Sequence, residues 1–361
     1  MANSNAAAKI PEEIIYDIFT RLPAKSIGQF RCVSKQWCSL LSEPKFIKTH
    51  LTLHSHKHLV DKLIVAGHFL HTITFTHDVQ GEIDVISRKL DFQQLSDHWV
   101  SVDGSCNGLV LAIRREDAKY LINPTTLKYH KIPNFDLALP VSDSCSMYGF
   151  GYDVVTDDYK VVALSYYDID EPDIVDTFVD IYSVRKGLWK RLGSSPYDHS
   201  LTDPASGVLV NGALHWLAKI SDHPCVLVAF DLSDETFLEV PVPPTDYNYS
   251  FFELVALRGR LCMFTRSIDT ITICLMEDYG VNMSWTVFRL TVPSLHDSLC
   301  TPLCSMTDDD IIMEVDEKLV VYNMKEDDLW DMAVDVRSDM NTARTFIESL
   351  VCPSFGNGTE D

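Results

Sequence analysis

The chain has 361 residues, a formal net charge of −22 and an apolar fraction of 46%. The length suggests about two domains, and the composition excludes a disordered chain because so many apolar residues can form a core. The acidity argues against nucleic acid, since such a surface neutralises few phosphates. It suits either simple solubility or a basic protein partner.

The charge is uneven along the chain. Residues 9–50 carry seven Lys and Arg against four Asp and Glu, so this segment has a net charge of +3 and the remainder −25. A mildly basic N-terminal head on a strongly acidic body indicates two modules with different partners.

No export signal or membrane segment is expected. The start, MANSNAAAK, leads into an amphipathic pattern, and no apolar run approaches the roughly 20 residues that span a membrane. The ten cysteines are scattered without a CxxC motif, which predicts reduced thiols, and Cys300 and Cys304 lack a second pair for zinc. We therefore expect the protein in the cytoplasm, the nucleus or both.

Residues 1–8 are expected to be disordered and residues 9–53 to form a helical head. On a helical wheel of residues 12–22, one arc holds the apolar side chains Ile14, Ile15, Ile18, Phe19 and Leu22. Pro11 suits the first helical position, where a missing N–H costs nothing, and Pro23 ends the helix.

Two more short helices are predicted after this one, and Pro44 begins another turn or two. Ser34 suits the N-cap of the later helix. The apolar residues of this stretch are Ile27, Phe30, Val33, Trp37, Leu40 and Leu41. Such short helices bury too little surface to be stable alone. Their apolar side chains therefore pack either on the body of the same chain or on another protein, with Trp37 as an aromatic anchor.

The stretch IPEEIIYDIFTRLPAKSIGQFRCVSKQWCSLLSEPKFIKTHL closely resembles an F-box, particularly its plant form. The resemblance implies that the head docks on the Skp adaptor of a cullin–RING ubiquitin ligase. Skp adaptors are acidic as a family, which agrees with the charge of the head. Carried over by position, the adaptor-facing or framework residues are Pro11, Ile14, Leu22, Pro23, Ile27, Phe30, Val33 and Trp37. Some of them must form the internal core of the head.

Beyond residue 60, short β-rich runs alternate with turn residues. Asn211-Gly212 separates two apolar runs and is the preferred two-residue hairpin turn; Asn107-Gly108 and Arg258-Gly259 have similar settings. These runs predict an all-β body.

A repeating unit consists of a strand, a small polar residue, a loop, an aromatic residue and a second strand. The aromatic positions are Tyr129, Trp189, Phe237, Trp285 and Trp330, at spacings of 60, 48, 48 and 45 residues. Such spacing is typical of four-stranded propeller blades, and residues 60–353 have room for roughly six. We expect these aromatic residues to fill the wedges between blades rather than to bind a ligand.

This body resembles the F-box-associated domain of plant F-box proteins, which is related to kelch-type propellers. The motifs that carry the resemblance include SCNGLVLA (105–112), NPTTLKYHKIP (123–133), YGFGYDVVTDDYKVV (148–162), NGALHWLA (211–218) and FIESLVCP (346–353). The Gly-Gly doublet of true kelch blades is absent. The expected fold is multidomain: a small all-α F-box, a hinge at 54–59, an all-β propeller of roughly six blades and a disordered tail at 354–361.

Motifs that suggest chemistry do not meet the requirements of a site. His50, His54, His56 and His58 have no neighbouring carboxylate or cysteine, so a solvated hinge is expected there rather than a metal site. In residues 168–180, Asp173 and Val179 stand where a calcium loop needs Gly and Glu. No P-loop, nucleophile-elbow or RING zinc pattern occurs. We expect no cofactor, no metal and no catalytic residue.

The leading hypothesis is a non-catalytic substrate receptor of an SCF-type cullin–RING ubiquitin ligase. Its head would bind the Skp adaptor, and its propeller would bind an unknown protein through loops on one face. The candidate loops are 165–178, 194–206 and 243–251, and the last contains the candidate substrate-binding residues Asp246, Tyr247 and Tyr249.

Two other functions are consistent with the sequence. A propeller enzyme or glycan-binding module with an unrelated helical cap predicts His, Asp or Glu clustered at the centre of the ring. If the chain is instead a free-standing interaction scaffold outside any ligase, a change in its abundance should leave the lifetimes of its partner proteins unchanged.

Overall fold

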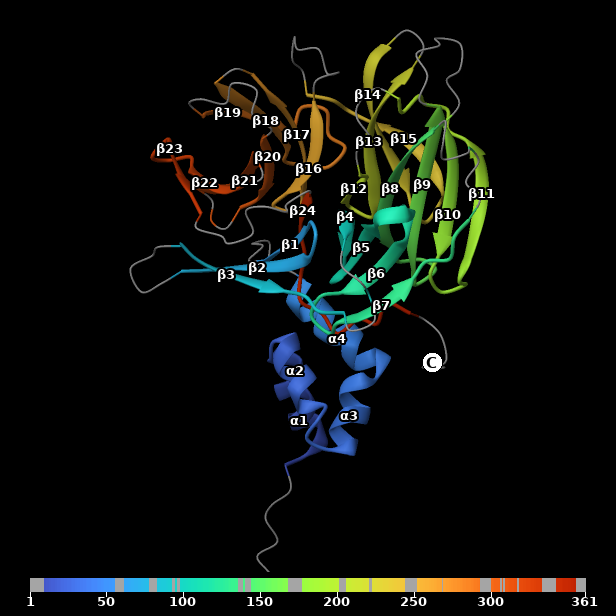
Figure 1. Ribbon diagram of the computed structural model, residues 1–361, viewed down its shortest axis with the longest axis vertical. Coiled ribbons are helices and arrows are strands. Elements are labelled where there is room, and N and C mark those ends of the chain that lie inside the picture. Colours follow the sequence, from blue (N-terminus) through green and yellow to red (C-terminus); the bar gives the residue numbers. More distant parts are fainter. Residues whose placement is uncertain are drawn as a thin grey trace, which may run out of the picture.

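The computed structural model places a small helical head below a ring of β-sheets (Figure 1). It describes residues 10–55, 62–77, 83–92, 95, 98–135, 139, 144–167, 177–200, 206–220, 223–243, 252–267, 269–292, 300–305, 307, 309–316, 318–332 and 342–354. The expected combination of an all-α head with a six-bladed propeller is confirmed.

Four helices form the head: α1 (Glu12–Arg21), α2 (Ala24–Phe30), α3 (Lys35–Ser42) and α4 (Pro44–Ser55). Ser34 caps α3 as expected, because its side chain accepts a hydrogen bond of 3.1 Å from the backbone N–H of Trp37. α4 is longer than the one or two turns predicted. Its apolar side chains Ile47 and Leu51 pack against the propeller, and this tertiary contact extends the helix.

The described part of the body forms six antiparallel sheets of four strands, which we number as blades from the N-terminus. Blade 1 consists of β24 (Thr342–Thr345), β1 (Lys62–Ala66), β2 (Leu70–His77) and β3 (Ile83–Lys89). Blade 2 consists of β4 (Trp99–Cys106), β5 (Leu109–Arg114), β6 (Lys119–Asn123) and β7 (Lys128–Lys131), with a 3-10 turn at Arg115–Asp117. Blade 3 consists of β8 (Ser144–Asp153), β9 (Asp158–Tyr167), β10 (Phe178–Ser183) and β11 (Leu188–Ser194).

The remaining blades repeat this arrangement. Blade 4 consists of β12 (Val208–Val210), β13 (Ala213–Ile220), β14 (His223–Asp231) and β15 (Thr236–Val240). Blade 5 consists of β16 (Glu253–Leu257), β17 (Arg260–Arg266), β18 (Thr270–Met276) and β19 (Trp285–Thr291). Blade 6 consists of β20 (Cys300–Cys304), β21 (Asp310–Val315), β22 (Lys318–Asn323) and β23 (Asp328–Asp331).

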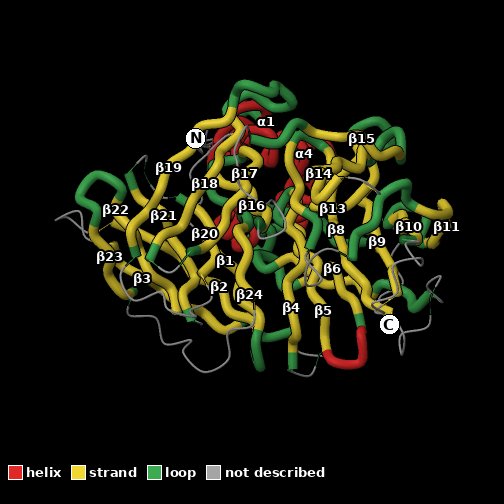
Figure 2. Tube along the Cα trace, turned by 90° about the horizontal axis from the view of Figure 1, so that it is seen from above, coloured by secondary structure: helices red, strands yellow, loops and turns green. Residues whose placement is uncertain are grey.

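Blade 1 is built from both ends of the body, and this closes the ring (Figure 2). β24 pairs antiparallel with β1, with Ala343 opposite Val65 and Thr342 opposite Ala66. The two strands are nearly 280 positions apart in the sequence, so the pairing joins the last blade to the first. Ring closure follows from this one ladder.

The core consists of six apolar clusters, one between each pair of neighbouring blades. Blades 2 and 3, for example, meet through Leu109, Leu121, Phe150 and Val161, all of which are fully buried. The other five clusters join blades 1 and 2, 3 and 4, 4 and 5, 5 and 6, and 6 and 1. Each blade therefore buries both faces against its neighbours, as a propeller requires.

A repeated turn explains the constant step from the small polar residue to the aromatic residue. In blades 2, 4 and 6, the side-chain oxygen of the polar residue accepts hydrogen bonds from the backbone N–H groups two and three positions later; these residues are Asn123, Asp231 and Asn323. The fifth residue of each turn then takes a positive φ, at Leu127 (56°), Glu235 (55°) and Asp327 (53°). The polar residue therefore fixes the turn that starts the outer strand.

The three predicted two-residue hairpins are also present, between the first two strands of blades 2, 4 and 5. Both central residues of each turn have positive φ, as a type I′ turn demands; the pairs are Asn107-Gly108, Asn211-Gly212 and Arg258-Gly259.

The aromatic residues of the repeat lie between blades, with one exception. Trp189 of blade 3 donates its indole N–H to the carbonyl of Pro133 at the end of blade 2 (2.9 Å), and Trp285 of blade 5 contacts Pro241 of blade 4 in the same way (3.1 Å). Trp330 is 38% exposed on the outer strand β23 of blade 6. The prediction of a core wedge is therefore wrong for Trp330.

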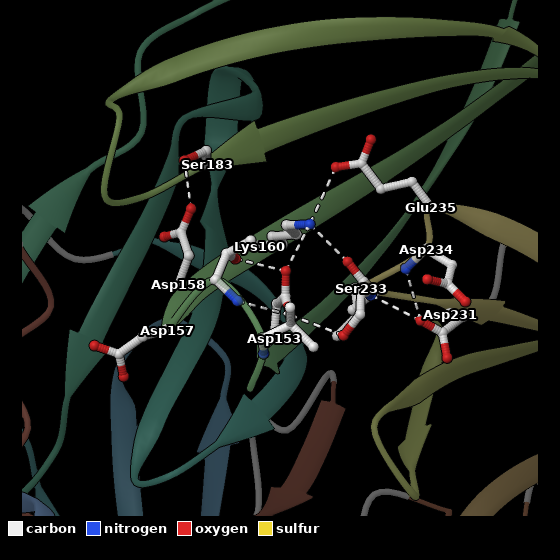
Figure 3. A network of polar contacts seen from close by, with 12 residues as sticks. Asp153, Asp157, Asp158, Lys160, Ser183, Asp231, Ser233, Asp234 and Glu235 are labelled. Carbon is white, nitrogen blue, oxygen red and sulfur yellow. Dashed lines mark hydrogen bonds and ion pairs between the residues drawn. The ribbon is translucent and has the colours of Figure 1, made fainter.

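A buried ionic network joins blades 3 and 4 (Figure 3). The ammonium group of Lys160 lies 3.0 Å from a carboxylate oxygen of Asp153 and 3.0 Å from one of Glu235, and it donates to the carbonyl of Leu232 (2.6 Å). Burial alone would raise the pKa of the Asp153 carboxyl, but the hydrogen bonds that it accepts outweigh burial and hold this pKa well below its usual range. Lys160 thus fixes two hairpins that the sequence places about 75 residues apart.

We predict that Lys160→Met destabilises the propeller by about 3–5 kcal/mol, because it leaves the fully buried carboxylate of Asp153 without its cation. Urea unfolding followed by fluorescence measures the change. The matched control is Lys190→Met, which removes an exposed partner of Glu235 and should cost less than about 1 kcal/mol. Equal losses in the two variants would contradict the importance of the buried pair.

Two buried histidines make the stability depend on pH. Burial lowers the pKa of His199 and of His215 from 6.5 to about 4, so the fold favours their neutral forms. Between pH 6.5 and pH 4 only the unfolded chain takes up these protons, so each histidine should lower the free energy of unfolding by about 3 kcal/mol across this window. Chemical denaturation at half-unit pH steps should show this slope, and the His199→Gln, His215→Gln double variant should flatten it.

Candidate adaptor-binding surface and substrate-binding face

An apolar stripe on and beside α1 is formed by Ile10, Ile14 and Ile18. Ile14 and Ile18 are four positions apart and share one side of the helix, whereas Ile10 precedes the helix, before the non-helical Pro11. Their exposed fractions are 56%, 52% and 48%. Val33, between α2 and α3, is 62% exposed. Apolar side chains gathered on one helix face mark a surface that another molecule covers.

The inner face of α1 faces a core of the head's own. Phe19, Phe30 and Trp37 pack around one another with ring centroids 5.0–5.8 Å apart. The buried members of this core are Phe19, Ala24, Ile27, Leu41, Phe46 and, from the far end of the chain, Leu350. The core of the head is therefore complete without the exposed isoleucines.

The structure separates the eight residues predicted for the adaptor into two groups. Pro11, Ile14, Pro23 and Val33 are exposed and available to a partner. Ile27 is fully buried, and Leu22, Phe30 and Trp37 are half-buried against the head's own core. The sequence suggested that Trp37 anchors another protein, but Trp37 is packed within the head.

Ile10 and Ile18 complete the stripe but were not among the predicted site residues. The signal for Ile18 was present, since it is four residues from Ile14 on the helix, whereas Ile10 lies before the helix begins. The helical wheel did not reveal which apolar residues face outward, because Ile14, Ile15, Ile18, Phe19 and Leu22 occupy one arc and only the packing of α4 divides it.

Two histidines of α4 hold the end of α1. The ring nitrogen Nε2 of His50 is 2.8 Å from the carbonyl oxygen of Leu22, and that of His54 is 3.1 Å from the carbonyl of Thr20. The two rings stack at 4.3 Å, and burial lowers the pKa of His50. The expectation of a solvated hinge is wrong for this pair, because they continue α4 and satisfy carbonyls that α1 leaves free at its C-terminus.

The propeller presents two different faces. The turns between the first and second strands of a blade lie on the face next to the head, which we call the head face. There Lys48 of α4 pairs with Asp157 in the β8–β9 turn at 3.3 Å. Neighbouring strands of a blade are antiparallel. The connections between second and third strands therefore start and end on the opposite side, which we call the far face, and so do the links that join blades 2 to 6 to one another (Figure 1).

All three candidate substrate loops connect strand ends that lie on the far face. Residues 165–178 include the link from β9 to β10, residues 194–206 lead from blade 3 to blade 4, and residues 243–251 lead from blade 4 to blade 5. Asp246, Tyr247 and Tyr249 lie outside the described residues. The flanking strand ends lie on the side away from the head, whereas the sequence predicted one shared face without saying which.

The centre of the ring holds charges of both signs. Asp103 of β4, Glu253 of β16 and Arg344 of β24 come from inner strands of three blades, and Arg266 pairs with Glu253 at 2.6 Å. Burial raises the pKa of Asp103, and nearby Arg344 partly offsets this effect. Glu253 is therefore paired with an arginine, whereas the pKa of the Asp103 carboxyl stays raised despite nearby Arg344.

Neither a metal site nor a membrane helix emerges in the described part of the chain. Among these residues no group of three or more His, Cys, Asp or Glu is arranged to hold a metal ion. The four helices of the head are also too short and too polar to cross a membrane. Cys300 and Cys304 are buried in strand β20.

Comparison with known proteins agrees with both modules. Residues 8–49 match the F-box domain family, and residues 61–351 match the F-box associated beta propeller domain family. The chain is 29% identical to the F-box/kelch-repeat protein At3g23880 of Arabidopsis thaliana, over 96% of each chain. It is also 29% identical to the F-box protein CPR1 of the same plant, over 95% of this chain and 89% of that protein. The chain therefore belongs to the plant F-box proteins that carry an F-box-associated β-propeller domain.

Proposed function

We propose that the protein is the substrate-recognition subunit of an SCF-type cullin–RING ubiquitin ligase. The observation that carries this proposal is the apolar stripe of Ile10, Ile14 and Ile18, which stays exposed although the core of the head is complete. Membership of the F-box family supports an adaptor role in general and the Skp adaptor as the partner of the head. We assign the stripe, with Pro11, Pro23 and Val33, to that contact.

The propeller has the complementary role of holding the protein to be ubiquitinated. Its far face points away from the head, so a substrate bound there does not compete with the adaptor (Figure 1). The chain then contributes proximity, because a substrate lysine held near a ubiquitin thioester reacts as in an intramolecular step. No acid–base residue of this chain is required, and we propose that the protein is not itself an enzyme.

Two observations bear on the other functions. A propeller enzyme or glycan-binding module would cluster His, Asp or Glu at the ring's centre, whereas Asp103 and Glu253 come from different blades there and Glu253 is paired with Arg266. A free-standing scaffold would use an exposed apolar face as well, so it is the F-box membership of the head that favours the ligase subunit over a scaffold.

Charge and compartment are consistent with a protein substrate. The sequence segments that connect strands on the far face contain 17 Asp and Glu against one Arg, a balance that repels the phosphates of nucleic acid. We propose that the protein acts in the cytoplasm or nucleus, the compartments in which these ligases work.

Adaptor binding should depend on exposed residues of the head. We expect Ile14→Asp combined with Val33→Asp to weaken binding of a plant Skp adaptor by about 100-fold, because each change places a charge in an apolar contact. Leu22 and Trp37 are unsuitable targets, since they support the head's own core. Isothermal titration calorimetry with the full chain provides the affinities.

The matched control for this experiment is Val155→Asp, at a position that is 76% exposed but lies in a propeller turn. It should bind the adaptor as tightly as the unaltered chain. Failure of the unaltered chain to bind, or equal binding by the double variant, contradicts the proposed contact.

Loss of the adaptor contact should uncouple recognition from degradation. In plant cells, proteins captured by proximity labelling on the Ile14→Asp, Val33→Asp chain should match those of the unaltered chain, but their half-lives should lengthen several-fold because no ubiquitin machinery is recruited. Cycloheximide-chase proteomics measures these lifetimes. If no captured protein changes lifetime, the chain acts as a scaffold.

A further inference from the structure

The C-terminal residues 346–354, which we call the strap, connect the closed ring to the head. They follow β24 directly and run across the head face of the propeller (Figure 1). Although the head is encoded at the other end of the sequence, the strap contacts both modules. Most of its anchors lie in the propeller, and Leu350 lies in the head.

The first anchors of the strap lie in blade 1. Phe346 is buried in the cluster between blades 1 and 2, and its backbone N–H donates to the carbonyl of Lys62 (3.3 Å). The ammonium group of Lys62 pairs with Glu348 at 3.1 Å, with both side chains largely covered. The strap therefore leaves the ring along the first residues of β1.

Blade 2 holds the next part of the strap. The side-chain amide of Asn123, which is fully buried, donates to the carbonyl oxygens of Ser349 (3.1 Å) and Val351 (2.8 Å). At Gly108 the strap comes so close that an added Cβ would lie 2.3 Å from the Ser349 hydroxyl. Position 108 therefore requires glycine for two reasons: its positive φ and the close approach of the strap.

Leu350, between these two anchored residues, points the other way. It is 3% exposed and completes the core of the head beside Ile27, Leu41 and Phe46. Val351 packs with Ile47 and Leu51 of α4 in the cluster that joins blades 2 and 3. One short segment is therefore fixed in the body by its neighbours and in the head by Leu350.

We propose that the strap fixes the direction in which the far face points from the adaptor-bound head, and that Leu350 and Asn123 are positioning residues for ubiquitin transfer. The role in ubiquitin transfer rests on the proposed function, whereas the fixed orientation does not. A substrate lysine reaches the ubiquitin thioester only if head and propeller keep one relative orientation, since small misplacements cost orders of magnitude in an intramolecular step.

The orientation can be tested on the chain alone. A water-soluble carbodiimide joins Lys48 to Asp157, whose charged groups are 3.3 Å apart across the boundary between head and propeller. We expect Leu350→Asp and, separately, Asn123→Ala to lower the yield of this cross-link at least threefold, measured by mass spectrometry. Leu188→Asp is the matched control, because Leu188 is 67% exposed on the outer strand of blade 3, and it should leave the yield unchanged.

Adaptor binding and small-angle X-ray scattering complete this experiment. Leu350→Asp fails to bind the adaptor if the substitution unfolds the head. Asn123→Ala leaves the head's core intact, so in that case its cross-link yield alone tests the proposed orientation. Retained cross-linking and an unchanged radius of gyration in Asn123→Ala would overturn the proposal. Lack of adaptor binding by the unaltered chain would instead count against the proposed function, because the cross-link does not involve the adaptor.

A second readout concerns ubiquitin transfer. In a ligase reconstituted with adaptor, cullin and RING subunit, the lysines of this chain itself can serve as acceptors, so no substrate is needed. We expect the unaltered chain to be modified at a few lysines and Asn123→Ala at a broader set, at equal adaptor affinity. An identical set of modified lysines would show that the strap does not position the propeller.

Discussion

The pairing of β24 with β1 closes the ring, and the other contacts of the body depend on it. A four-stranded blade has two apolar faces, and each is stable only when it packs on a neighbour. Without closure, the cluster in which Leu63 and Phe75 meet Leu303 and Val321 would be open to solvent on both blades. Closure therefore gives the sixth interface and makes every blade equivalent to the others in burial.

The direction of the closing strand also decides where the chain ends. β24 is antiparallel to β1, and β1 begins on the side of the head, so β24 must end there. The strap thus emerges beside the helices, where Leu350 can enter their core and Asn123 can hold the adjacent backbone. Ring closure and the seating of the head are consequences of the same strand.

Much of the architecture could be predicted from the sequence because its signals are local. The step from Asn123 to Tyr129 reflects a turn that side-chain and backbone groups of a few residues build by themselves, and the Asn-Gly pairs dictate their hairpins. Packing between distant segments could not be predicted in this way. Nothing near Leu350 indicates a helical core about 300 residues earlier, and nothing near His50 indicates the end of α1.

The candidate adaptor surface shows the same division. The apolar pattern and the resemblance to an F-box located the head and most of its candidate binding residues. Helical periodicity, however, gives only the direction in which a side chain points and not which other residues cover it. Trp37 and Ile14 were equally apolar candidates, and the structure packs Trp37 against Phe19 and leaves Ile14 exposed. The sorting depends on α4 and Leu350, which fill one side of α1 and leave the other to solvent.

The exposed stripe has a physical cost that the rest of the molecule makes tolerable. Ile10, Ile14 and Ile18 would add nothing to stability in the free chain, and polar residues at those positions would make the head more soluble. The strongly acidic propeller keeps the whole chain soluble despite the stripe. The head, in turn, needs no partner to complete its core, since Leu350 already does so. A surface that stability does not require and solubility disfavours is best explained by binding.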